Sequence, residues 1–368
     1  MNDVLNRLSP SLASLPVYIP GRPIEEVARE HGLDPASIIK LASNENPFGP
    51  SPKAVTAMEQ AVRQLHLYPD GSATAIKRRL AASLGVEPGN LILGNGSNEI
   101  LEFVGHAVMG SGVEIVVPEF CFAVYPIVTA LFGGRLVTVP TREFAADIPA
   151  MLAAITPSTA VVFLANPNNP TGTRTSAEAV QQLLEGVPKD VLVVMDEAYI
   201  EFLDDPVDLL PAIRSGKHPN LILCRTFSKI YGLAGLRLGY GIASPALIAA
   251  MEKVRQPFNV NSIAQAGALA ALDDAEHVQR TRDNNRTGVA YLQQAFGALG
   301  LPFVPSHANF VLVQTGNGAR VFGELQKRGI ITRPMGSYGL PEWLRISVGT
   351  PAENARFLTA LREVLGTP

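Results

Sequence analysis

A lysine that follows two hydroxyl residues is the feature of this sequence best suited to covalent chemistry. Lys229 stands after Thr226 and Ser228 at the end of an apolar run, and Arg237 follows past two glycines. Hydroxyl groups and a guanidinium bind phosphate, while a desolvated lysine beside a cation loses its proton readily and forms a Schiff base with an aldehyde. Pyridoxal 5'-phosphate (PLP) carries both groups, so we predict that PLP binds at Lys229.

A second candidate anion site lies in the segment LILGNGSNEIL, which begins at residue 91. Its pattern predicts a short strand, a glycine turn at Gly94 and Gly96, and a helix whose first turn holds Ser97. Free backbone N–H groups at a helix N-terminus attract anions, and glycine lets a phosphate approach the backbone. An ordinary turn between a strand and a helix remains the alternative.

Several polar and aromatic side chains follow other apolar runs. Asp196 ends the run VLVVM, and a carboxylate there needs a partner, which a protonated pyridine nitrogen would supply. Tyr199 could reach the ring's phenolic oxygen, and Asn169 in NPNNPTGT could donate a hydrogen bond to a ligand oxygen. Phe120 in PEFCFAVYP could cover the face of a planar ring, although such a residue is more often part of the core.

Two arginines near the C-terminus are candidates for substrate binding. Arg345 interrupts the apolar strand-like run WLRISV, so it needs an anionic partner such as a substrate carboxylate or phosphate. Arg333 could serve the same purpose or could be a surface residue.

The elements that must position these residues alternate between strands and helices. Continuous apolar runs at 113–117, 136–139, 159–165 and 190–199 predict a parallel sheet buried on both faces, and hence an α/β fold. Ligands bind at the carboxyl ends of the strands in such sheets, which is where the candidate residues fall. We expect a segment at 1–40, a large domain at 41–255 and a small α+β domain at 256–368.

Composition narrows the functional classes. The chain has 368 residues, a net charge of -3 and a pI near 6.1, and it lacks a basic run, which argues against nucleic-acid binding. Its two cysteines lie in apolar contexts, which favours buried thiols in a reducing compartment. Neither a metal-ligand spacing, a signal peptide nor a membrane span is recognised, so we expect a cytoplasmic protein without a metal.

The chain resembles the fold-type I PLP-dependent aminotransferases and, among them, those that act on histidinol phosphate. The resemblance covers almost the whole chain and rests on these motifs: YIPGRPIEEVAREHGLDPASIIKLASNENPFGPSPKA, YPDG, PNNPTGT, DEAYIEF, TFSKIYGLAGLRLGYG and LRISVGTPAENARFLTAL. It implies a large PLP-binding domain with a mostly parallel seven-stranded sheet between helices, a smaller α+β domain, and a homodimer with shared active sites.

The resemblance also implies roles for individual residues. Lys229 would hold PLP as an aldimine and carry the transferred proton, and Asp196 would bind the pyridine nitrogen. The ring oxygen would be bound by Asn169 and Tyr199, and the ring face by Phe120. The phosphate would be held by Gly96, Ser97, Asn98, Thr226, Ser228, Arg237 and, from the neighbouring subunit, Tyr68. The substrate would meet Arg345, Arg333, Tyr18 and Asn46.

The implied reaction is ping-pong transamination between glutamate or 2-oxoglutarate and histidinol phosphate or its keto form, imidazole acetol phosphate. An aminotransferase for phenylalanine or tyrosine is the alternative, because a pocket that accepts an imidazole can accept another ring. A PLP-dependent decarboxylase would share the fold. A PLP-sensing regulator would require a DNA-binding module, and the sequence before residue 40 has no helix-turn-helix pattern.

Overall fold

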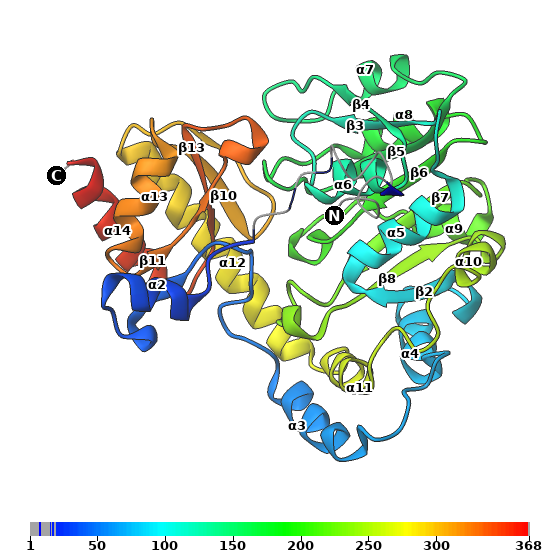
Figure 1. Cartoon of the computed structure of the whole chain (residues 1–368), viewed down its shortest axis with the longest axis horizontal. Helices are drawn as coiled ribbons and strands as arrows, with labels where there is room; N and C mark the ends of the chain where they lie inside the picture. Colours follow the sequence, from blue (N-terminus) through cyan, green and yellow to red (C-terminus); the bar gives the residue numbers. More distant parts are fainter. Residues whose placement is uncertain (1–6, 9–14, 16, 18–19, 367–368) are drawn as a thin grey trace.

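The computed structural model describes residues 7–8, 15, 17 and 20–366, and its largest element is a seven-stranded sheet (Figure 1). The strand order is β2-β8-β7-β6-β5-β3-β4, and β8 alone runs against its neighbours. The strands are β2 (Leu91–Asn95), β3 (Glu114–Pro118), β4 (Arg135–Val139), β5 (Thr159–Ala165), β6 (Leu192–Asp196), β7 (Leu221–Thr226) and β8 (Leu238–Ala243). The expected mostly parallel sheet is therefore confirmed.

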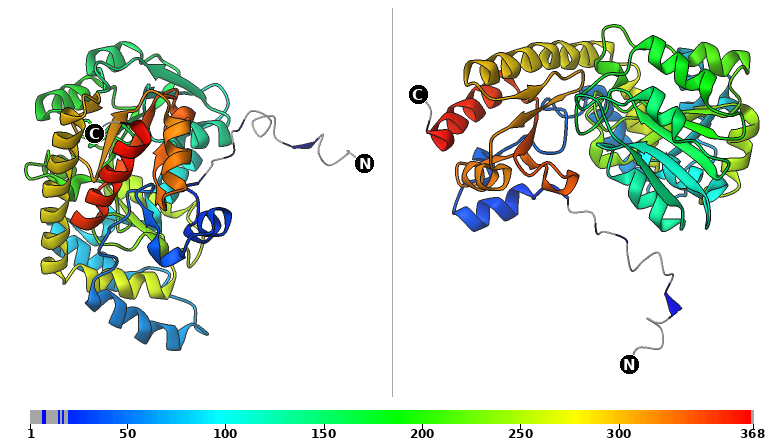
Figure 2. Two further views of the ribbon diagram at one scale, coloured as in Figure 1. Left: turned by 90° about the vertical axis from the view of Figure 1, so that its left-hand side faces the viewer. Right: turned by 90° about the horizontal axis from the view of Figure 1, so that it is seen from above.

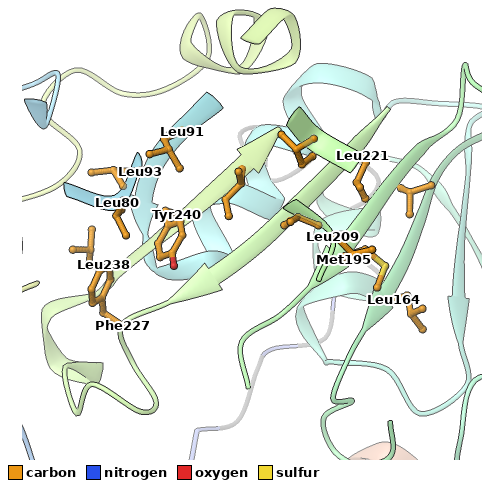
Figure 3. Packing of buried hydrophobic residues seen from close by; sticks show 14 of the residues in the cluster. Leu80, Leu91, Leu93, Leu164, Met195, Leu209, Leu221, Phe227, Leu238 and Tyr240 are labelled. Atoms are coloured by element: carbon orange, nitrogen blue, oxygen red, sulfur yellow. The ribbon is translucent and has the colours of Figure 1, made fainter. Parts of the chain in front are cut away.

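Helices bury both faces of this sheet. Side chains alternate along a strand, so Val162 and Leu164 of β5 enter one apolar cluster while Val161 and Phe163 enter the other. Figure 3 shows part of the first cluster. That face is covered by α3 (Pro52–Ala61), α4 (Thr74–Leu84), α7 (Ile148–Ala153), α8 (Ala177–Gly186), α9 (Leu210–Ser215) and α11 (Ser262–Ala271). The opposite face is covered by α5 (Gly96–Val108), α6 (Val124–Leu131) and α10 (Pro245–Glu252).

A smaller part of the molecule contains the C-terminal residues and lies on the left of Figure 1. Its antiparallel sheet has the order β12-β13-β10-β9, and β1 pairs in parallel with β11 beside it. Its strands are β1 (Ile39–Lys40), β9 (Phe303–Val304), β10 (Phe310–Gln314), β11 (Ile330–Ile331), β12 (Arg333–Pro334) and β13 (Trp343–Ser347). Its helices are α2 (Ile24–His31), α13 (Gly318–Gln326) and α14 (Pro351–Leu365).

The helix α12 (Ala275–Ala298) joins the two parts and is the long yellow helix in Figures 1 and 2. Its 24 residues give a length of about 36 Å. Near its start, Arg282 Nε donates to the backbone oxygen of Glu201 at 2.9 Å, on the side of the large sheet. Further along, Leu292 and Phe296 are fully buried in the core of the small part. One continuous helix thus contacts both parts.

The division expected after residue 255 stays a prediction. The helix α11 follows that position, yet its buried alanines Ala264 and Ala268 belong to the apolar cluster of the large sheet. The segment expected at 1–40 also contacts the far end of the chain, because Val27 and Ala28 of α2 pack in one cluster with Ile331. The chain therefore crosses between the two parts more than once.

Candidate active site

A cavity of about 450 Å³ lies between the carboxyl ends of the large sheet's strands and the small part. Its wall contains residues from β6, β7, β12 and β13, from the start of α5, and from the segment 42–45. Most residues predicted from the sequence line this one cavity: Gly96, Ser97, Asn98, Asn169, Asp196, Tyr199, Thr226, Ser228, Lys229, Arg237, Arg333 and Arg345.

Lys229 reaches the cavity from a short loop that follows β7. The side chain of Phe227 is fully buried and its backbone oxygen accepts a hydrogen bond from Leu233 N at 3.1 Å, which closes the loop around the lysine. Lys229 Nζ donates to the backbone oxygen of Ser43 at 3.1 Å and lies 5.7 Å from the ring centre of Tyr199. The amine therefore lies in the cavity wall, at a place where an aldehyde could meet it.

The predicted phosphate-binding groups converge on the N-terminus of α5. Gly96 has a φ of 74°, and its N–H donates to the backbone oxygen of Arg237 at 3.0 Å, which joins the start of α5 to the loop before β8. This positive φ favours glycine, and a Cβ at residue 96 would lie 2.8 Å from Arg237 Nη2 and displace the guanidinium. Thr226 Oγ1 donates to Ser228 Oγ at 3.0 Å beside them. Helix N–H groups, two hydroxyls and an arginine together form a site suited to a phosphate dianion.

Asp196 is buried at the carboxyl end of β6, with 4% of its surface exposed. Its Oδ1 accepts from Ala198 N at 3.1 Å, and its Oδ2 accepts from the hydroxyl of Tyr125 at 2.9 Å. Burial raises the pKa of Asp196, and these hydrogen bonds together with the charge of Lys229 oppose the rise. The sequence did not reveal Tyr125, because a tyrosine among apolar helix residues gives no sign of which carboxylate its hydroxyl meets.

The segment 42–45 belongs to a motif that carries the family resemblance, and in the structure it contacts both sides of the cavity. Asn44 has a φ of 55° and is buried, and its Nδ2 donates to the hydroxyl of Tyr199 at 2.9 Å. Asn44 Oδ1 accepts from Ser347 Oγ of β13 at 3.1 Å. The asparagines of SNEN were the available signal, because asparagine adopts a positive φ more readily than most residues.

The two predicted arginines stand opposite each other on neighbouring strands. Arg333 of β12 pairs with Arg345 of β13 in the sheet register, and both line the cavity. Arg345 Nη1 donates to Asn169 Oδ1 at 2.6 Å, and Nη2 donates to the backbone oxygen of Ala42 at 2.8 Å. Because the side-chain oxygen of Asn169 accepts this bond, the side-chain nitrogen of Asn169 is the group that can donate to a ligand.

The helix α14 begins soon after β13, at a capping box formed by Thr350 and Glu353. This helix start fixes where the strand ends.

Three predicted residues among those that the structure describes do not line the cavity. Phe120 packs against Phe144 with ring centres 5.4 Å apart, whereas Phe122 lines the cavity, and the stacking role of Phe120 stays a prediction. Asn46 is buried, and its Nδ2 donates to the backbone oxygen of Ile230 and to Thr281 Oγ1. These bonds connect the segment around Asn46 to the loop after β7 and to α12. Tyr68 lies elsewhere and is 84% exposed. Tyr18 lies outside the described residues.

Three further observations concern the described part of the chain. Cys121 and Cys224 are buried free thiols, as the sequence suggested. No cluster of His, Cys, Asp and Glu within the described ranges could hold a metal ion. Among the helices that the structure describes, none has both the length and the apolar character needed to cross a membrane.

The residues present fit PLP. The phosphate site at the start of α5, the amine of Lys229 and the buried carboxylate of Asp196 line one cavity. Burial makes the charged form of the Asp196 carboxylate costly, and a cationic ring nitrogen would complete its environment. These are the groups that the aldehyde, phosphate and pyridine nitrogen of PLP require.

Comparisons with known proteins agree with this arrangement. The family model described as aminotransferase class I and II matches residues 36–361. Histidinol-phosphate aminotransferase of Akkermansia muciniphila is 50% identical over 352 residues, covering 95% of this chain and 96% of the relative. Histidinol-phosphate aminotransferase 2 of Pseudomonas fluorescens is 51% identical over 362 residues, covering 97% and 96%. The crystal structure of histidinol-phosphate aminotransferase from Sinorhizobium meliloti with PLP matches with a TM-score of 0.88 and 34% identity, covering 98% of each chain.

Proposed function

Because this chain belongs to the class I and II aminotransferase family, we propose that it is a PLP enzyme that exchanges an amino group between histidinol phosphate and 2-oxoglutarate. This reaction places it in histidine biosynthesis. The observation that carries the choice of substrate is the pair Arg333 and Arg345, which line the cavity that also holds Lys229. The relatives named for this activity support it, since they are about half identical over nearly the full length.

PLP, when bound, supplies an electron sink that stabilises the carbanion formed when a proton leaves the substrate carbon. The amine of Lys229 would hold the cofactor aldehyde and, once released from it, would carry the proton from the substrate carbon to the cofactor carbon that receives it. The carboxylate of Asp196 would hold the pyridine nitrogen and favour its charged form. Tyr199 and Asn169 would hold the ring oxygen, and Phe122 lies in the cavity wall.

The two substrates differ in the anion that they present to the arginines. Glutamate offers carboxylates, and the guanidinium of Arg345, oriented by its bond to Asn169, would bind one of them. Histidinol phosphate offers a phosphate with up to two negative charges, for which Arg333 supplies a second cation. The same two strands therefore serve both halves of the exchange.

A comparison of half-reactions tests this assignment. The PLP-loaded protein is mixed with histidinol phosphate or with phenylalanine, and stopped-flow absorbance follows conversion of the cofactor to pyridoxamine phosphate. We expect kcat/KM for histidinol phosphate to exceed that for phenylalanine by about 100-fold, because phenylalanine has no phosphate to bind the arginine pair. Equal or faster conversion by phenylalanine would instead establish the aromatic aminotransferase.

We also propose a homodimer with shared active sites and a cytoplasmic location. The dimer is supported by an exposed apolar patch at Leu65, Leu67, Tyr68 and Phe258, where Tyr68 stacks on Phe258 at 4.8 Å between ring centres. Such a patch is typical of a protein interface. A reducing compartment is supported by the two buried free thiols.

A further inference from the structure

A buried tyrosine lies directly behind the candidate cofactor site. Tyr125 stands in the first turn of α6, which packs on the face of the sheet opposite α4 and α8, and none of its surface is exposed. Its hydroxyl donates to Asp196 Oδ2 at 2.9 Å. The hydroxyl of Tyr125 therefore extends from α6 across an apolar layer to the carboxylate of Asp196, which lines the cavity.

The ring of Tyr125 is held in one orientation by its neighbours. It stacks on Phe163 with ring centres 4.5 Å apart and planes 7° apart, and it meets Phe122 edge-on at 5.8 Å and 87°. Phe163 is fully buried in β5, and Phe122 lines the cavity. Close packing on both sides prevents the hydroxyl from turning away from Asp196.

Among the titratable groups around Asp196, Tyr125 is the neutral side chain that donates a hydrogen bond to its carboxylate. Burial raises the pKa of Cys121 to about 12 and that of Cys224 well above its ordinary value, so both thiols stay neutral. Glu197 is paired with Arg225 at 2.8 Å. Lys229 acts on Asp196 through its charge. Burial and the charge of Asp196 raise the pKa of Tyr125, so its hydroxyl keeps the proton that it donates.

We propose that Tyr125 is a positioning residue that keeps the Asp196 carboxylate charged and directed toward the pyridine nitrogen of PLP, an inference that rests on the proposed function. Asp196 and the ring nitrogen share one proton. A hydrogen bond donated to the carboxylate makes it less basic, so the proton resides on the ring nitrogen. Without that bond the proton shifts to the carboxyl group, the nitrogen becomes neutral, and the ring is a weaker electron sink.

The test uses the full-length protein loaded with PLP labelled with ¹⁵N in its ring. In the wild type we expect the ¹⁵N NMR shift of a pyridinium between about pH 6 and pH 9. The variant Tyr125→Phe should move that shift toward neutral pyridine, weaken PLP binding about tenfold, and lower kcat with little change in KM. Ile115→Val is the packing control, because it removes one methylene from the same apolar cluster and leaves Tyr125 and both of its ring neighbours in place. It should lower the melting temperature and leave the ¹⁵N shift unchanged.

A second variant keeps the proposal testable if Tyr125→Phe does not fold. The change Tyr125→3-fluorotyrosine preserves the shape of the ring and makes the phenol a stronger donor, so the ring nitrogen should become harder to deprotonate. The role of Tyr125 is overturned if Tyr125→Phe leaves the ¹⁵N shift at the wild-type value, if 3-fluorotyrosine leaves the pH of ring-nitrogen deprotonation unchanged, or if Ile115→Val moves the shift as much as Tyr125→Phe does. Wild-type protein that retains PLP and turns over histidinol phosphate would leave the proposed function standing in that case, whereas wild-type protein that binds no PLP overturns both.

Discussion

At the scale of single residues, the site depends on groups whose charge is compensated by the chain itself. Asp196 accepts from Ala198 N and the Tyr125 hydroxyl, and Arg345 donates to Asn169 and to the backbone of Ala42. These contacts orient the carboxylate and the guanidinium before any ligand arrives. Preorganised groups cost no rearrangement during the reaction, which is the general reason why such sites are effective.

Replacing the candidate lysine tests the covalent role directly. Lys229→Ala should lower the transamination rate by about 10³-fold, because both the aldehyde-binding amine and the proton carrier are lost. After borohydride reduction, mass spectrometry should find the cofactor on the wild-type peptide that contains residue 229 and on no peptide of the variant. Lys253→Ala removes an exposed lysine and is the matched control. Near wild-type turnover by Lys229→Ala would refute the assignment.

The arginine pair should separate the two substrates. Arg345→Lys keeps the charge but loses the planar fork, so kcat/KM for glutamate should fall about 100-fold. Arg333→Gln should lower kcat/KM for histidinol phosphate about tenfold and for glutamate much less, because the phosphate needs the second cation. Steady-state kinetics with each donor measures both effects. Equal losses for the two donors in Arg333→Gln would mean that Arg333 does not discriminate between the anions.

At the scale of elements, the phosphate site depends on close contact between β8 and the start of α5. A Cβ at Gly239 would lie 2.3 Å from Ser97 N and 2.9 Å from the backbone oxygen of Arg225. Gly239→Ala should therefore displace the first turn of α5 and weaken PLP binding about tenfold or more. Gly89→Ala is the control, because a Cβ there meets nothing within 4 Å. A fluorescence titration with PLP would show whether the two variants differ as expected.

The short 3-10 helix at Ile200–Phe202 carries Glu201, a partly buried acid with a buried Oε2 atom, which should make stability depend on pH. Burial raises the pKa of Glu201 to about 7 from an ordinary value of 4.5, and the charges of Arg225 and Arg282 oppose the rise. Between these values the folded state holds a proton that the unfolded state has lost, so stability falls as pH rises. Wild type should lose unfolding free energy relative to Glu201→Gln between about pH 5 and pH 8. Denaturant titrations at both pH values measure the difference, and a constant difference would contradict the argument.

The sequence was most informative where chemistry depends on the end of a single strand. Asp196 and Thr226 close apolar strands, so their place at the sheet's edge followed from the pattern alone. Asn44 was missed because its partner Tyr199 lies 155 residues away, and no local pattern specifies such a contact. Phe122 was missed because the turn between β3 and α6 decides which of two nearby aromatic rings reaches the cavity.

At the scale of the whole molecule, the cavity is built by segments that are distant in sequence. The large sheet supplies Lys229 and Asp196, the small part supplies Arg333 and Arg345, and α12 contacts both parts. Because cofactor groups and substrate groups come from different parts, their separation depends on how those parts pack. Tyr68, unlike the buried Asn46, is a predicted site residue that lies exposed beside Phe258 and away from the cavity.

Subunit mixing tests whether Tyr68 completes the site of a second copy. Tyr68→Phe keeps the stacking on Phe258 but removes the hydroxyl, so that homodimer should lose activity, as should Lys229→Ala. When the two variants are unfolded, mixed in equal amounts and refolded, half of the dimers are hybrids, and each hybrid holds one site with both Lys229 and Tyr68 intact. Activity should then recover to about a quarter of wild type. Activity that remains at the average of the two separate variants would mean that Tyr68 acts within its own subunit or not at all.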